Sequence, residues 1–262
     1  MPTDSPNLPG WLTGRRPAGP PPRPPITGEE VTATALRLVD QHGLADFSMR
    51  KLAEELGTGT SSLYWRFSSK EELLLSVADA VLSEVPVPPT GDTDWKSRLR
   101  AYASSFRDAV HAHPNAAPLL INFITVSPGV LRAVEGVVEV LEAAGLTGNG
   151  LRDAYNAYAG YVLGFTIVEM APPFSEEWTE AIPEYLRSLA SSEFPVITRF
   201  LPHLENQAFG LRWKTWAEAS LEKSFSFGLE ALLVGFEHQI ARAGERDEGL
   251  QPSIVASSNP SA

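Results

Sequence analysis

Apolar residues recur at intervals of three and four along most of this chain, and we find no convincing alternation of apolar and polar residues that would indicate a strand. The first such segment carries Val31, Ala35 and Val39, with Thr27 placed to cap its start and Gly43 to end it. The spacing therefore predicts an all-α fold.

The same periodicity predicts a series of helices along the chain. Three short helices and one longer one are expected within residues 27–85, and the later three begin near Ser48, Thr60 and Ser69. Further helices are expected from Asp94 to about Val110 and over residues 115–125, 128–144, 151–170, 175–190, 194–201 and 213–243.

Proline content divides the chain into tails and folded parts. We expect a disordered Pro-rich tail over residues 1–25, in which proline excludes helix and central strand. A second disordered tail is expected over residues 249–262. Between them we expect a helix-turn-helix domain with a linking helix (26–85) and a second helical domain (92–243). The arginines of the first tail suit either a plain leader or a basic arm that reaches DNA.

Charge is distributed unevenly. The chain has a net charge of −11, but residues 1–70 hold eight Lys or Arg against seven Asp or Glu. The excess of negative charge therefore lies in the C-terminal part. The chain has no cysteine, which excludes disulfides and thiol chemistry and fits a cytoplasmic protein. No apolar run approaches the ~20 residues of a membrane helix, and we expect no signal peptide.

The stretch 57-GTGTSSLYWRFSSKEEL-73 follows a predicted short helix and a glycine turn, as in a helix-turn-helix. If Leu63 and Phe67 face inward, helix geometry turns Tyr64 and Arg66 outward. For Trp65 we expect a place in the core or against the first helix. The candidate DNA-binding residues are Arg50, Thr60, Ser61, Ser62, Tyr64, Arg66 and Lys70. From spacing alone, a solvated helical face stays as good an explanation.

Residues 27–74 resemble the DNA-binding domain of the TetR family of transcriptional regulators, above all in "LAEELG" and "SSLYWRFSSKEEL". Weaker similarity lies in "WKSRLRAYASSFRDAVHAHP" and "FSFGLEALLVGFEHQI". The resemblance implies that Arg50 reads a guanine, that Thr60, Ser61 and Ser62 face the major groove, and that Tyr64 contacts backbone and a base methyl. Lys70 would bind phosphate. Arg66 stands where many members have histidine, so it too favours phosphate.

The acidic part contains the material of a ligand pocket. Tyrosines and phenylalanines are frequent there, and each of them taken singly is better explained as a core residue. The set has more Tyr than a dry core accommodates, because every hydroxyl needs a partner. The candidate pocket residues are Tyr102, Phe106, Phe123, Tyr155, Tyr158 and Phe165.

The resemblance also bears on the ligand. The tetracycline repressor uses histidines to hold a magnesium–drug chelate, and corresponding histidines are missing here. We interpret His111 and His113 as a helix C-terminus that favours positive charge rather than as metal ligands. Glu169 lies near the acidic position of the family. We therefore expect an aromatic organic effector, no metal site and no cofactor.

The last long helix is a candidate for dimerisation, together with residues 151–170 of each chain in a four-helix interface. Its candidate interface residues are Leu221, Phe225, Gly228, Leu232, Gly235 and Phe236. Because the helix is apolar all round, a central core helix of one subunit is the alternative.

These features together predict a ligand-responsive transcriptional regulator, a repressor that binds a palindromic operator as a homodimer and is released by a small organic effector. The alternative is a helical small-molecule-binding protein or enzyme without DNA binding. The chain lacks the catalytic motifs H-E-x-x-H, G-x-x-x-x-G-K-[ST] and a strand-linked G-x-G-x-x-G, so we expect no enzymatic activity.

Overall fold

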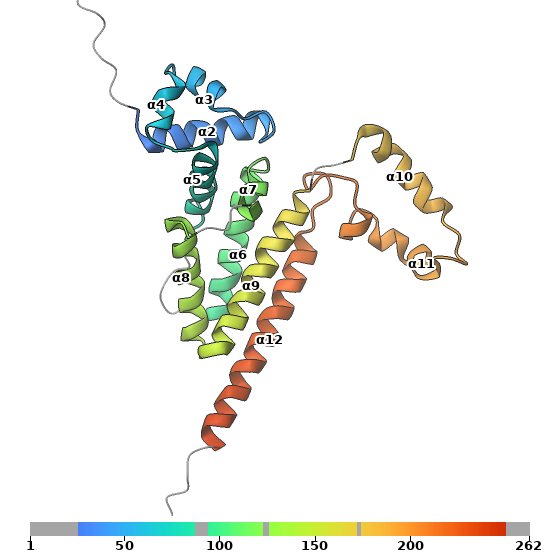
Figure 1. Ribbon diagram of the computed structural model, residues 1–262. Coiled ribbons are helices and arrows are strands. Elements are labelled where there is room, and N and C mark those ends of the chain that lie inside the picture. The colour runs from blue at the N-terminus through green and yellow to red at the C-terminus, as the bar shows by residue number, and fades with distance from the viewer. Residues whose placement is uncertain (1–25, 87–93, 123–125, 172–173, 250–262) are drawn as a thin grey trace, which may run out of the picture.

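The structure is a computed structural model that describes residues 26–86, 94–122, 126–171 and 174–249. Within these ranges every regular element is a helix, which confirms the all-α prediction. Both expected tails lie outside the described residues, except Gly249, which ends the last helix. Figure 1 shows a small N-terminal head on top of a bundle, with an arm extending to one side.

The head consists of α2 (Gly28–His42), α3 (Met49–Glu55) and α4 (Thr60–Tyr64). The expected caps form: the Thr27 hydroxyl accepts from the amide of Glu30 at 3.1 Å, and the Ser48 hydroxyl accepts from the amide of Lys51 at 3.3 Å. Gly57 has a φ of 62°, which lets the chain turn between α3 and α4. The buried side chains that hold the three helices together include Val31, Ala35, Val39, Leu52, Ala53 and Leu63.

Helix α5 (Lys70–Ser83) joins the head to the bundle (Figure 1). It packs against α2 in the head and against α7 (Ala117–Asn122) and α8 (Pro128–Ala143) in the bundle. Leu73, Leu74, Val77 and Val81 are buried along it. One helix therefore carries packing contacts to both parts of the molecule.

The bundle is formed by α6 (Trp95–Ala112), α8, α9 (Gly148–Glu169) and α12 (Glu222–Gly249). In Figure 1, α9 and α12 run side by side along one edge and α8 lies on the other. Ion pairs along α6 reach α12, with Lys96 Nζ at 2.6 Å from Glu237 Oε1 and Arg100 Nε at 2.5 Å from Glu230 Oε1. No helix in the described ranges is both long and apolar enough to cross a membrane.

The expected helix over residues 213–243 begins later than predicted, at Glu222. Trp213 stays in the preceding loop because the Asn206 side-chain oxygen accepts from its amide at 3.1 Å and from the amide of Lys214 at 3.0 Å. These bonds fix a turn where the sequence pattern suggested a helix.

The arm is formed by α10 (Glu176–Ser188), α11 (Pro195–Leu204) and the 3₁₀ turn η1 (Phe209–Leu211). It has a small core of its own, made by Leu186, Leu201 and Trp213. Trp178, Tyr185 and Phe200 are exposed on it, at 62%, 64% and 44%. The arm thus presents more aromatic surface than its own core buries.

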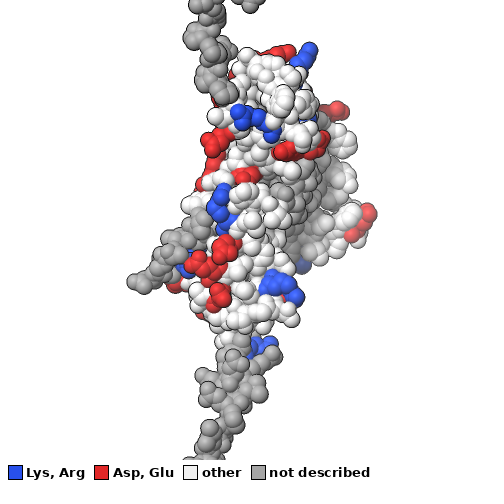
Figure 2. All heavy atoms as spheres, turned by 60° about the vertical axis from the view of Figure 1, so that its left-hand side comes forward, with Lys and Arg blue, Asp and Glu red and all other residues white. Residues whose placement is uncertain are grey.

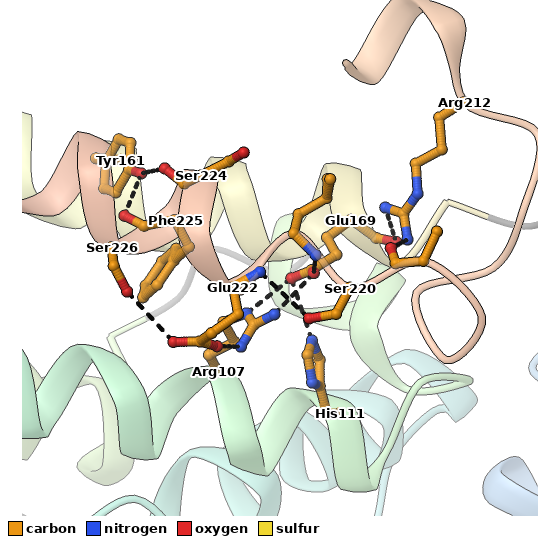
Figure 3. A network of polar contacts seen from close by, with 12 residues as sticks. Arg107, His111, Tyr161, Glu169, Arg212, Ser220, Glu222, Ser224, Phe225 and Ser226 are labelled. Carbon is orange, nitrogen blue, oxygen red and sulfur yellow. Dashed lines mark hydrogen bonds and ion pairs between the residues drawn. The ribbon is translucent and has the colours of Figure 1, made fainter. Parts of the chain in front are cut away.

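A buried polar network closes the bundle where the arm returns to it (Figure 3). The Glu169 carboxylate is fully buried and accepts two hydrogen bonds from the Arg107 guanidinium, each 2.8 Å long. It also lies 3.2 Å from His111 Nε2 and accepts from the amide of Leu221 at 3.2 Å. Arg107 further pairs with Glu222. One carboxylate therefore ties α6, α9 and the start of α12 together.

Removal of this carboxylate tests its importance for stability. Glu169→Gln leaves Arg107 with an incompletely compensated buried charge, so we expect the free energy of unfolding to fall by about 3 kcal/mol or more in urea titrations at pH 7. Glu177→Gln, at an exposed position of α10, is the control and should change it little.

The loss of stability in Glu169→Gln should become smaller as the pH falls. Burial by itself would raise the pKa of Glu169, but hydrogen bonds from His111 and Arg107 and the charge of Arg107 lower it to about 2. Its stabilising contribution is therefore complete above the ordinary value of 4.5 and is lost as the pH falls toward 2. The stability difference between wild type and Glu169→Gln should shrink across that interval; a constant difference would contradict the assignment.

Candidate functional site

The first candidate site is the outer face of α4 and the adjoining part of α3. Leu63 is 1% exposed and anchors α4 in the core of the head. This orientation leaves Thr60, Ser61 and Ser62 exposed at the start of the helix and Tyr64 51% exposed at its end. Short hydroxyl side chains at the start of α4 allow close approach of a ligand to its backbone. We call Arg50, Thr60, Ser61, Ser62, Tyr64, Trp65 and Arg66 the recognition surface.

Trp65 does not lie in the core or against the first helix, so this prediction is wrong. Its side chain is 89% exposed, because α4 ends at Tyr64 and Phe67 rather than Trp65 packs back onto the head. Arg66 is exposed beside it. A large exposed aromatic next to an exposed guanidinium enlarges the recognition surface, and it is a residue that the sequence reasoning missed.

The other two candidate DNA-binding cations, Arg50 and Lys70, differ in how firmly neighbouring groups hold their side chains. Arg50 is exposed, and its Nε lies 3.8 Å from Glu54 Oε1, one turn along α3. Such an exposed pair contributes little and leaves the guanidinium available. Lys70 instead donates from Nζ to the Phe47 carbonyl at 2.8 Å and lies over the Phe47 ring, 5.4 Å from its centroid. In this structure Lys70 fastens α5 to the loop before α3.

Charges on the head are mixed rather than gathered. On the face seen in Figure 2, basic and acidic side chains alternate over the head and the bundle below it. This pattern agrees with the nearly balanced composition of residues 1–70. The cations of the recognition surface are Arg50 and Arg66, and both are exposed.

The second candidate site is a cavity of about 200 Å³ inside the bundle. It lies between α5, α6, α8 and α9, and most of its lining is apolar. The lining residues are Ala78, Asp79, Leu82, Tyr102, Phe106, Leu120, Ser127, Val130, Ala133, Val134, Val137, Tyr155, Tyr158, Ala159, Val162 and Leu163. Four of the six predicted pocket residues are among them: Tyr102, Phe106, Tyr155 and Tyr158.

The other two predicted pocket residues lie elsewhere. Phe165 does not line the cavity; its ring packs against Phe225 and Phe209, at centroid distances of 5.3 and 4.8 Å, so it belongs to the contact between α9 and α12. Phe123 lies outside the described residues. The sequence reasoning missed Asp79, which the periodicity placed only as an ordinary helix position, and Ser127, which lies just before the helix expected over residues 128–144.

The phenols of the cavity are neutral hydrogen-bonding groups. Burial and the neighbouring Tyr155 raise the pKa of Tyr102 to about 12, and burial raises the pKa of Tyr155 as well. The Tyr158 hydroxyl is already used, since it donates to the Leu99 carbonyl at 2.7 Å. Asp79 Oδ1 accepts from the Gly129 amide at 2.7 Å and from the Ser127 hydroxyl at 2.5 Å. Through these two bonds a residue of α5 caps α8.

His113 connects the head to the bundle at the end of α6. Its Nδ1 lies 2.8 Å from Asp40 Oδ2 on α2, and its Nε2 lies 3.1 Å from Glu84 Oε2 at the end of α5. The Asn115 side chain also donates to the Asp40 carbonyl at 2.8 Å. Because both ring nitrogens face carboxylates, both must carry a proton to be satisfied, which favours the imidazolium.

The predicted dimer residues of α12 mostly face their own subunit. Leu221, Phe225 and Phe236 are buried against the bundle, and Gly228 lies against the Tyr161 hydroxyl, where a Cβ would collide. These residues are used in packing within the subunit, which the sequence did not indicate because an evenly apolar helix gives no sign of which face is inward. Leu232 is partly buried and Gly235 is exposed.

A different face of α9 and α12 is open. It presents Ala157, Gly160, Gly164 and Val168 from α9 and Phe227, Ala231 and Val234 from α12. A Cβ on Gly160 or Gly164 would meet nothing within 4 Å, so the small residues are not required by the packing of the subunit itself.

A three-helix head with a helix-turn-helix, joined by one shared helix to a bundle with an internal cavity, defines the class of helix-turn-helix regulatory proteins. Comparison with known proteins gives the family. The model of bacterial regulatory proteins of the tetR family matches residues 31–77, and that of the tetracyclin repressor-like C-terminal domain matches residues 87–240. The chain belongs to the TetR family.

Individual relatives agree. The transcriptional repressor DrrR1 of Streptomyces coeruleorubidus is 32% identical over 90% of this chain and 86% of its own. The TetR family protein ActR of Streptomyces coelicolor, in complex with actinorhodin, is similar in structure with a TM-score of 0.68 and 27% identity, over 83% of this chain and 99% of that one. BioQ with its double-stranded DNA operator has a TM-score of 0.56 and 26% identity, over 81% and 99%.

The His113 bridge predicts a pH-dependent contribution to stability. Burial alone would lower the pKa of His113, but hydrogen bonds and charges from Asp40 and Glu84 raise it above 6.5. A raised pKa stabilises the folded state below pH 6.5, and the effect is lost as the pH rises through the folded value. His113→Gln should therefore lower the free energy of unfolding by about 1 kcal/mol at pH 6 and by less at pH 8.5.

Urea unfolding at the two pH values measures this difference. His42→Gln, at an exposed histidine at the end of α2, serves as the control and should show no such pH-dependent loss. Equal losses at both pH values in His113→Gln would show that the bridge does not depend on the imidazolium.

Proposed function

We propose that this protein is a ligand-responsive transcriptional repressor that binds a near-palindromic operator and is released by a small organic effector. Residues 26–85 act as the DNA-binding domain, and residues 92–243 bind the effector and form the dimer. The observation that carries the proposal is that α5 belongs to both: its start follows the recognition surface, and Ala78, Asp79 and Leu82 line the cavity. Support comes from relatives that are named repressors and from neighbours solved with DNA and with a ligand.

The proposed DNA contact uses the recognition surface. The exposed start of α4 enters the major groove, where the three hydroxyl residues approach base edges and Tyr64 meets backbone or a thymine methyl. Arg66 and Trp65 contact the phosphodiester backbone, and Arg50 reads a guanine. Lys70, which is bound to Phe47 here, positions α5 relative to α3, so it influences the recognition surface indirectly.

The proposed release follows from the cavity. A ligand that enters between α5 and α8 separates the helices that Asp79 holds together. Displacement of α5 changes the orientation of the head and hence the spacing of two recognition helices in a dimer. Because such coupling is reciprocal, operator DNA weakens effector binding by the same factor.

The proposed homodimer uses the open face of α9 and α12. Small residues on α9 permit close approach of a second copy, and Phe227 and Val234 supply apolar area beside them. The arm leaves the bundle where α9 ends and α12 begins (Figure 1), so its exposed aromatic side chains extend this apolar surface toward the partner.

We further propose that the protein has no enzymatic activity and acts in the cytoplasm, where its DNA target lies. The mainly apolar lining of the cavity suits ligand binding, and its neutral phenols and single carboxylate give no paired acid and base. The relatives are regulators rather than enzymes.

Operator binding tests the proposal directly. Duplexes selected from a random pool with purified protein should share a near-palindromic site. Arg66→Gln should then reduce the slope of log affinity against log salt by about 1, because one phosphate contact is lost, whereas Arg50→Ala should cost about 1–3 kcal/mol at one base pair and relax the preference there. Fluorescence anisotropy between 50 and 200 mM salt measures both.

Arg152→Gln, at an exposed arginine of α9 far from the recognition surface, is the matched control and should leave both quantities unchanged. Failure of the wild type to enrich any sequence, even at low salt, would defeat the proposed function.

The dimer face can be tested separately. Gly164→Leu adds a bulky side chain where the subunit itself has open space, and leucine favours helix over glycine, so the subunit should stay folded. We expect it to sediment as a monomer at concentrations at which the wild type is a dimer. Ala101→Leu, at an exposed position of α6, is the control; a dimeric Gly164→Leu would place the interface elsewhere.

A further inference from the structure

A second, more polar cavity of about 190 Å³ adjoins the first one. Leu82, Tyr102 and Ala133 line both, so the two cavities are neighbours that share these three residues. The second cavity, which we call the annex, is also lined by Ser83, Val85, Pro86, Gly129 and Arg132. It lies between the end of α5 and the first turns of α8.

The annex contains an oriented guanidinium. Arg132 Nη2 donates to the Ser83 hydroxyl oxygen at 3.1 Å, and that hydroxyl donates to the Asp79 carbonyl at 2.8 Å. Ser83 is thereby fixed as an acceptor for Arg132. In the described part of the chain Arg132 makes no other hydrogen bond and no ion pair. A guanidinium carries five donors, so most of them remain for a ligand.

The inner cavity has the opposite character. Asp79 places a carboxylate there, and the two phenols of Tyr102 and Tyr155 are neutral at pH 7. Among the described residues that line either compartment, Arg132 is the one cation. An anionic group is therefore disfavoured inside and favoured in the annex, while an apolar ring system is favoured inside.

We propose that the effector is an aromatic carboxylate that lies with its rings in the inner cavity and its carboxylate on Arg132 in the annex. This inference rests on the proposed function. It specifies the chemical class of the effector and which end of it lies in which cavity. The tyrosine hydroxyls can donate to a carbonyl or hydroxyl oxygen on the rings. Because Ser83 and Asp79 both belong to α5, a carboxylate drawn to Arg132 acts on the helix that positions the recognition surface.

Two probes that differ in charge test the proposal: 2-naphthoate and 2-naphthamide, each titrated calorimetrically into the full-length protein. The wild type should bind 2-naphthoate about fivefold more tightly, as expected for a charge-assisted hydrogen bond to the exposed Arg132 guanidinium. Arg132→Gln should abolish that preference and leave the affinity for 2-naphthamide unchanged. Arg132→Lys, which keeps the charge but not the planar fork, should give an intermediate ratio.

Arg152→Gln is the control, since it removes an exposed arginine of α9 that lines neither compartment, and it should keep the wild-type ratio. Equal binding of the two probes by the wild type, a preference retained in Arg132→Gln, or binding of neither probe would each overturn the proposal. Operator affinity is measured on the same samples without probe. If the wild type binds no operator, the proposed function is defeated. The ratio of the affinities for 2-naphthoate and 2-naphthamide, in contrast, reports on the annex alone.

Discussion

The packing of α5 against both the head and the bundle is the constraint on which the rest of the structure depends. Its first turns are held to the loop before α3 by Lys70, and its last turns line the cavity and the annex. The helix is capped at its start by Ser69 and is buried through Leu73, Val77 and Val81, so its packing is continuous from the head to the bundle. Any change in the cavity that moves one end of α5 therefore reaches the head.

The contact between α5 and α8 shows how closely this arrangement is specified. Asp79 accepts from the amide of Gly129 and from the hydroxyl of Ser127, which is itself the cap of α8. A Cβ at residue 129 would collide with the Asp79 carboxylate, so a larger residue there would displace this carboxylate from the start of α8. A helix start that is capped from a neighbouring helix couples the positions of the two, because the free amides lose their partner if the helices separate.

Sequence alone predicted the parts of this structure that depend on local chemistry. The caps at Thr27, Ser48 and Ser69 and the inward position of Leu63 follow from short-range spacing. It failed where the outcome depends on distant contacts. Trp65 is exposed because α4 already ends at Tyr64. Leu221, just before α12, and Phe225 within it are turned inward because α9 lies there. Four of the six candidate pocket residues line the cavity, whereas Asp79 and Ser127 acquire their place beside it only when α5 meets α8.

The two sides of the bundle are held together by different interactions, and this difference bears on which helices an effector would displace. On the side of α9 and α12, the buried Glu169 network and the ion pairs of Lys96 and Arg100 join three helices through charge-assisted bonds. On the side of α5 and α8, the contact is mainly apolar and encloses the cavity. Among the described residues no ion pair joins α5 to α8, so a ligand that separates these helices has to break the Asp79 hydrogen bonds to Ser127 and Gly129 but no salt bridge between them. In the proposed mechanism the face of α9 and α12 stays fixed while α5 moves, so that displacement of a single helix becomes a change in the orientation of the head.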